Sequence, residues 1–120
     1  MLIKKFLEML NTVKVHHWRT RAYSTHKATD ELYADLNKYV DEFVEVMLGG
    51  EAPLRISLRQ THLPLFDCNN QREFEKKMQE YKAFLQKLPQ PYAAESHLCN
   101  IRDEMLSTID KALYQLTLVK

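Results

Sequence analysis

Apolar residues recur at steps of three and four along four stretches of the chain, and this spacing places them on one face of an α-helix. The pattern predicts helices over residues 2–18, 26–48, 70–88 and 91–118. We therefore expect an all-α fold, a four-helix bundle that forms a single domain over residues 1–120. The expected core stripes are Ile3, Phe6, Leu10 and Val13; Tyr33, Leu36, Val40, Phe43 and Met47; Phe74, Met78, Tyr81, Leu85 and Leu88; and Ala94, Leu98, Ile101, Met105, Thr108, Ala112 and Leu116.

The residues at the ends of these stretches are typical of helix termini. Ser24 or Thr25 is suited to cap the second helix, and the Gly-Gly pair at 49–50 is suited to end it. Asn70 followed by Glu73 resembles a capping box, so we expect the third helix to begin there.

Residues 51–69 separate the second and third stretches and contain Pro53 and Pro64, which interrupt any long helix. We predict that this segment is a long crossover connection, which would allow the second and third helices to run in the same direction. His62 lies in this segment, and we expect it on the surface. Pro91 suits the first turn of the fourth helix.

Composition and charge argue against several classes of protein. The net charge is +1 with both signs interleaved, so the pool of basic charge that nucleic-acid binding needs is missing. The sequence has no apolar stretch long enough to span a membrane, and Glu8 argues against an N-terminal signal peptide. We therefore expect a cytoplasmic protein without nucleic-acid or membrane binding, in which Cys68 and Cys99 are reduced, buried thiols.

Candidate metal ligands are concentrated in residues 15–45. This stretch contains His17, His26, Asp30, Asp41 and Glu45. His26 and Asp30 are one helical turn apart, as are Asp41 and Glu45, so each pair shares a helix face. Imidazole and carboxylate together suit a hard or borderline divalent metal such as Fe(II).

The reach of a single helix decides how these groups can meet. Fifteen residues of helix separate His26 from Asp41 by roughly 22 Å, which is too far for both to bind one ion within one chain. Two copies of the helix that cross antiparallel about a two-fold axis would bring the histidines of one to the carboxylates of the other. Such a contact would form two equivalent sites in a homodimer.

Each of these residues also has a purely structural interpretation. His17 continues the apolar stripe of the first helix, so it is also consistent with a buried, hydrogen-bonded histidine. Asp41 and Glu45 are also consistent with a solvated acidic face that has Lys38 as a neighbour. We expect His16, on another face of the first helix, to be a surface or interface histidine.

The stretch resembles the signature of the Dps family, the mini-ferritins. The resemblance lies in His17-Trp18, in His26 with Asp30, and in Asp41 with Glu45, and the spacing from His26 to Glu45 matches without a gap. The interval from His17 to His26 is shorter than in typical members. The similarity is greatest to uncharacterised Dps-like proteins from viruses and environmental sequences. It implies a ferritin-like bundle, at least a dimer and in some members a larger shell.

The resemblance also implies a function, a possible ferroxidase. Fe(II) would be bound between two subunits and oxidised by peroxide or dioxygen, with storage as Fe(III), although another divalent metal would suit the same donors. The ligands would be His17 and His26 from one chain and Asp41 and Glu45 from the other, without further catalytic residues. Asp30 would support a second metal or orient a water.

Trp18 would form a wall of the site.

The shortened His17-to-His26 interval favours an alternative: a metal-free, dimeric helical-bundle interaction protein. Dps proteins often bind DNA through a basic tail, which is missing here, so we expect no DNA-binding residues.

Overall fold

The computed structural model describes residues 2–50, 62–90 and 92–118, and helix is the only regular secondary structure in these ranges. The chain forms a short 3-10 turn, η1 (Tyr92–Ala94), before its last helix. The all-α prediction is confirmed for the described residues, whose arrangement is compatible with a four-helix bundle. The helices are α1 (Leu2–Arg19), α2 (Tyr23–Leu48), α3 (Gln71–Gln86) and α4 (Ser96–Thr117).

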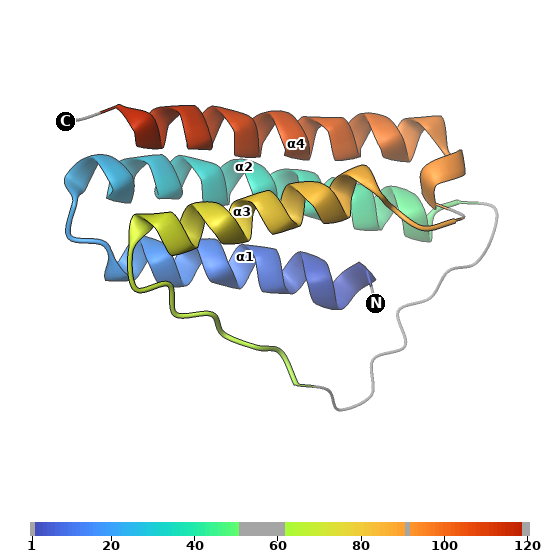
Figure 1. Cartoon of the computed structure of the whole chain (residues 1–120). Helices are drawn as coiled ribbons and strands as arrows, with labels where there is room; N and C mark the ends of the chain where they lie inside the picture. Colours follow the sequence, from blue (N-terminus) through green and yellow to red (C-terminus); the bar gives the residue numbers. More distant parts are fainter. Residues whose placement is uncertain (1, 51–61, 91, 119–120) are drawn as a thin grey trace.

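The four helices lie alongside one another, with α2 packed against both α1 and α4, and α3 packed against α4 (Figure 1). The helix α3 also contacts α1, since the rings of Phe84 and Phe6 meet edge to face with 6.4 Å between their centroids. Followed from N- to C-terminus in Figure 1, α2 and α3 run in one direction, and α1 and α4 run in the other. The predicted crossover connection falls largely on residues 51–61, which lie outside the described ranges.

The core is formed by the apolar stripes of the four helices. Phe6 of α1 and Phe43 of α2 are fully buried and meet edge to face at 5.2 Å between ring centroids. Burying an aromatic or aliphatic side chain of this size contributes about 1.5–3 kcal/mol relative to leaving it exposed. Packing between stripes, rather than helix propensity, therefore holds the helices together.

The predicted stripes are largely but not fully buried. The stripe of α3 is confirmed at every position, including Leu88 just beyond the helix. Ile3, Tyr33 and Thr108, however, are only half-buried, and Ala94 is exposed and belongs to η1 rather than to α4. Ile109 is buried where the sequence pattern favoured its neighbour Thr108.

The predicted cap of the second helix is wrong. The helix α2 begins at Tyr23, three residues before the predicted start, and Ala22 at its N-cap provides no side-chain hydrogen bond. The hydroxyl of Thr25 instead donates to Oε1 of Gln71 on α3, at 3.3 Å. The Thr25 hydroxyl, which the local pattern assigned to an N-cap, therefore forms a contact between helices instead.

The predicted start of the fourth helix is also too early. The helix α4 begins at Ser96, after the separate 3-10 turn η1, and Pro91 lies outside the described residues. The capping residues of α3 are confirmed: Oδ1 of Asn70 accepts the backbone N–H of Glu73 at 2.9 Å, and the Glu73 carboxylate accepts the N–H of Asn69 at 3.1 Å.

The remaining local predictions concern the connection, the cysteines and the hydropathy. His62 is exposed, as predicted. Cys68 is buried, but Cys99 is only half-buried, and both are free thiols. Within the described ranges, no helix has the combination of length and apolar character that crossing a bilayer requires.

Candidate functional site

The two histidines of the candidate metal site hold each other in place. Nδ1 of His17 lies 2.9 Å from the backbone carbonyl of His26, and Nδ1 of His26 lies 3.0 Å from the backbone carbonyl of His17. The two rings stack, with 3.8 Å between centroids and 20° between planes. The end of α1 is thereby joined to the first turns of α2 across the short turn at 20–22.

These contacts determine which ring nitrogen carries the proton. A carbonyl oxygen can only accept a hydrogen bond, so Nδ1 must donate in both rings. In a neutral imidazole the other nitrogen, Nε2, then carries a free lone pair. A histidine that donates its Nδ1–H to a backbone carbonyl and offers Nε2 is a common arrangement of metal ligands.

Neither Nε2 atom has a hydrogen-bond partner among the described residues. Among the described residues, only the ring nitrogens of His16 are both sealed from solvent and without a hydrogen-bond partner. Nε2 of His17 is not among these sealed atoms, although most of the His17 side chain is buried. The hydroxyl of Thr29 lies 3.1 Å from Nδ1 of His17 and further restricts that ring.

The carboxylates of the candidate site are all exposed on α2. Asp30 lies one turn beyond His26, and Asp41 and Glu45 lie towards the other end of the helix. Their side chains form no ion pair or hydrogen bond with any residue that the structure describes. The structure therefore brings His17 and His26 together, and leaves Asp41 and Glu45 apart from them, as the reach of the helix predicts.

A single chain does not complete a metal site in the described ranges. No group of three or more His, Cys, Asp or Glu side chains comes close enough there to hold an ion. Trp18, the predicted wall of the site, is 69% exposed, with Nζ of Lys14 at 5.7 Å from its ring centroid. Tyr23 at the start of α2 is 73% exposed. Two large aromatic side chains, near the end of α1 and at the start of α2, thus remain uncovered.

His16 contradicts its prediction as a surface or interface residue. It is only 5% exposed, and its ring stacks on Phe74 of α3 with 4.2 Å between centroids. Burial lowers the pKa of His16, and the positive charge of Arg19 lowers it further, so the neutral ring is favoured. The sequence placed His16 outside the main stripe of α1 and gave no sign that α3 would cover that face.

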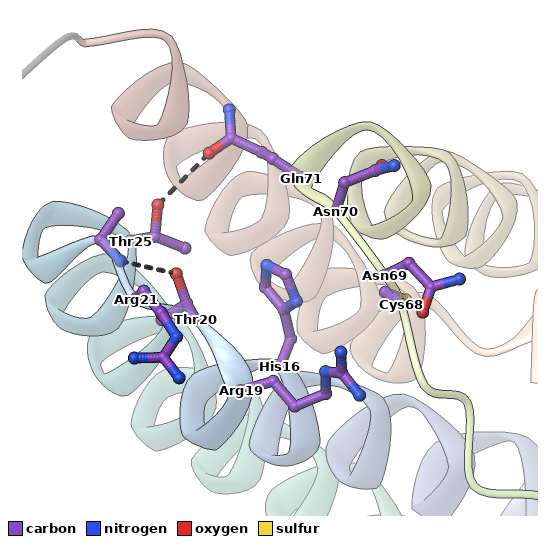
Figure 2. A pocket seen from close by; sticks show the side chains of 10 residues that line it. His16, Arg19, Thr20, Arg21, Thr25, Cys68, Asn69, Asn70 and Gln71 are labelled. Carbon is purple, nitrogen blue, oxygen red and sulfur yellow. Dashed lines mark hydrogen bonds between the residues drawn. The ribbon is translucent and has the colours of Figure 1, made fainter.

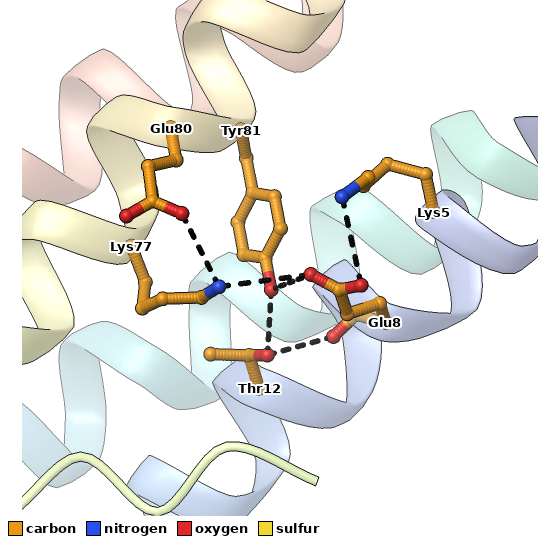
Figure 3. Close-up of polar contacts among 6 residues, drawn as sticks. All are labelled: Lys5, Glu8, Thr12, Lys77, Glu80 and Tyr81. Carbon is orange, nitrogen blue, oxygen red and sulfur yellow. Dashed lines mark hydrogen bonds and ion pairs between the residues drawn. The ribbon is translucent and has the colours of Figure 1, made fainter. Parts of the chain in front are cut away.

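A buried polar cluster between α1 and α3 was also missed by sequence reasoning. The phenol of Tyr81 donates to Oε2 of Glu8 at 2.8 Å, and its oxygen lies 2.8 Å from the hydroxyl of Thr12 (Figure 3). The ammonium groups of Lys5 and Lys77 lie 3.6 and 3.7 Å from the two carboxylate oxygens of Glu8.

The predicted burial of Tyr81 was one indication that a polar cluster would form around it. A buried phenol usually finds a hydrogen-bond partner, so a polar residue facing it was to be expected. Burial also raises the pKa of Tyr81 well above its ordinary value, which keeps the phenol protonated. These contacts join α1 to α3.

Comparison with known proteins identifies one relationship. Residues 17–116 match the model of a family of unknown function, DUF5856. The match begins at His17 and includes all the candidate ligands on α2. The chain matches no curated protein and no solved structure.

Proposed function

The chain belongs to the DUF5856 family, whose function is unknown, and we propose that it binds Fe(II) at a site shared between two copies of the chain. There the iron would be oxidised and sequestered, as the resemblance of residues 15–45 to Dps-like mini-ferritins implies. The observation that carries the proposal is the reciprocal hydrogen bonding of His17 and His26, which leaves both Nε2 lone pairs available.

The arrangement of the helices supports a ferritin-like version of the bundle. The helices α2 and α3 follow one another in the chain and run in the same direction in Figure 1. In helical bundles, consecutive helices that run in the same direction are joined by a long crossover connection. A bundle with one such crossover is the ferritin-like topology.

The oxygen donors of the proposed site come from the second copy. Asp41 and Glu45 lie one turn apart on the exposed surface of α2, without a charge partner among the described residues. An antiparallel α2 from a partner would place its carboxylates at His17 and His26, and its histidines at these carboxylates. The uncovered rings of Trp18 and Tyr23 would be buried in the same contact.

Fe(II) is the substrate of this reaction. Each Fe(II) releases one electron, so two of them supply the two electrons that, with two protons, convert one hydrogen peroxide to two waters. Carboxylates favour the higher charge of the Fe(III) product, because hard oxygen donors prefer hard cations. Asp30, one turn from His26, would support a second metal or orient a water.

A mixing experiment tests whether the site is shared. One variant carries His17→Ala and His26→Ala, and the other carries Asp41→Ala and Glu45→Ala. Neither should bind Fe(II) under anaerobic titration. When the two are refolded together, half of the dimers combine both variants and regain one of two sites, so about a quarter of wild-type binding should return.

The control uses a neighbouring carboxylate on the same helix. Glu42 is exposed like Asp41 but outside the proposed ligand set, so Glu42→Gln should bind and oxidise Fe(II) like the wild type. The shared site would be refuted by a dimer in which mixing restores no binding. It would equally be refuted if the carboxylate variant bound iron as well as the wild type.

The exposed aromatic side chains support a second candidate function. Trp18 and Tyr23 lie at adjacent ends of α1 and α2 and are typical of residues at protein interfaces. A metal-free, dimeric interaction protein would use this surface without iron. Anaerobic Fe(II) titration of the wild type distinguishes the two, because both place Trp18 in a dimer contact, which sedimentation of the wild type and of Trp18→Ala would test. In the alternative, the wild type is a dimer that Trp18→Ala weakens, and neither binds Fe(II).

A further inference from the structure

A cavity of about 430 Å³ opens at one end of the helices, between the end of α1, the start of α2 and the start of α3 (Figure 2). It is separate from the proposed iron site, because it is formed with α3 and none of the proposed ligands lines it. Three features of its wall point to a bound anion. The side chains that carry the argument are His16, Arg19, Arg21, Asn70 and Gln71.

The charged side chains that line the cavity are all positive. Arg19 and Arg21 line it, and none of its described lining residues is acidic. Arg21 has no ion-pair partner among the described residues. Arg19 pairs with Asp67 at 2.5 Å, but both side chains are about half exposed, and such surface pairs contribute little. The guanidinium of Arg21 is therefore free for a negatively charged ligand, whereas that of Arg19 is shared with Asp67.

The start of α3 adds to this positive potential. Asn70 caps the helix through the amide of Glu73, and no described residue accepts the backbone N–H groups of Gln71 or Arg72. Unpaired N–H groups and the helix dipole together favour an anion at this end. The side chain of Gln71 is held over the cavity by the hydroxyl of Thr25.

His16 is the independent observation that points to a ligand. His16 is one of the residues that line the cavity, and neither of its ring nitrogens has a hydrogen-bond partner. A buried polar group without a partner costs free energy, so natural proteins rarely leave one unsatisfied. Phe74 stacks on the face of the ring, so a partner for the two nitrogens has to approach the edge of the ring.

We propose that this cavity binds the phosphate group of a small phosphomonoester. A neutral imidazole presents one N–H donor and one lone pair that accepts. Neither has a partner in His16, so a fitting ligand offers both an acceptor and a donor. A phosphate monoester has a second pKa of about 6, so near pH 6 much of it keeps one P–O–H beside its acceptor oxygens, whereas sulfate and carboxylates offer only acceptors. Arginine pairs well with phosphate oxygens. The cavity is of the size of small-molecule pockets, which leaves room for the organic part of the ester.

Calorimetric titration at about pH 6, where the ester retains a P–O–H, and without metal tests the proposal on the full chain. The probes are glycerol 3-phosphate, inorganic phosphate, sulfate and glycerol, all at matched ionic strength. Glycerol 3-phosphate should bind most tightly, inorganic phosphate more weakly, and sulfate and glycerol not measurably. Tighter binding of inorganic phosphate than of the ester would assign the site to the free ion and overturn the phosphomonoester.

Three variants locate the binding. Arg21→Gln and His16→Phe should each weaken glycerol 3-phosphate binding about tenfold or more, and thermal unfolding checks that both fold. Arg72→Gln is the matched control, because it removes the same charge near the start of α3 from an exposed residue outside the cavity. Equal weakening by Arg72→Gln, sulfate binding as tight as phosphate, or no binding by the wild type would each overturn the proposal. Iron binding is measured separately, so the two proposals can fail independently.

Discussion

The phenol oxygen of Tyr81 on α3 lies 2.8 Å from Oε2 of Glu8 on α1, and both side chains are buried. This hydrogen bond joins residues that are 73 positions apart in the chain. A carboxylate removed from water needs such partners, since leaving one unsatisfied is costly. The pair therefore selects the alignment of α3 on α1 that satisfies both groups.

We expect Tyr81→Phe to destabilise the protein. The substitution keeps the ring but removes the donor, which leaves Glu8 and Thr12 short of a partner in a buried site. The expected loss in the free energy of unfolding is about 1–3 kcal/mol, measured by urea denaturation. Tyr114→Phe removes an exposed hydroxyl and should change stability by less than about 0.5 kcal/mol. Equal stability of Tyr81→Phe and the wild type would contradict this account of the cluster.

Stability should also fall at alkaline pH because of Tyr81. Burial, together with the neighbouring Glu8, raises the pKa of the phenol above its ordinary value of 10.0. The folded protein then retains a proton that the unfolded chain loses, so this contribution is complete below about pH 10 and decreases as the pH rises further. The decrease approaches about 1.4 kcal/mol per pH unit for one group. Urea denaturation between pH 8 and 11 should show a shallower decline for Tyr81→Phe than for the wild type.

The two cysteines should differ in reactivity. Burial raises the pKa of the Cys68 thiol, and the negative charge of Glu73 raises it further, so its thiolate is scarce at pH 8. Cys99 is half-buried and therefore more accessible. Iodoacetamide followed by mass spectrometry should modify Cys99 first, and Cys68 only after denaturant is added. Faster modification of Cys68 than of Cys99 in the native protein would contradict the buried position of Cys68.

The cap of α3 gives a further prediction. Asn70→Ala removes the side-chain acceptor of the Glu73 amide and should cost about 0.5–2 kcal/mol of stability. Asn69→Ala is the control, because Asn69 contributes only its backbone N–H to the Glu73 carboxylate. If the two variants unfold at the same urea concentration, the cap of α3 contributes nothing measurable.

The candidate metal site could be predicted in part. The positions of His26, Asp30, Asp41 and Glu45 along one helix follow from spacing, because the rise of a helix is constant. The mutual hydrogen bonds of His17 and His26 could not be predicted, since they depend on how tightly the turn at 20–22 closes. The cap predicted at Ser24 or Thr25 failed for the same reason: the early start of α2 and the contact of Thr25 with Gln71 depend on neighbouring elements.

The amino-acid order alone is enough to establish four helices and most of their buried faces, because helical periodicity repeats within a few residues and the hydrophobic effect acts on each stripe. The partners of His16, Glu8 and Tyr81 become known only when the helices are packed. Each of these side chains meets a residue from a distant part of the chain, and burial removes the water that would otherwise satisfy it. The short local pattern does not contain that information, which is why both the polar cluster and the cavity at His16 emerge from the packed structure.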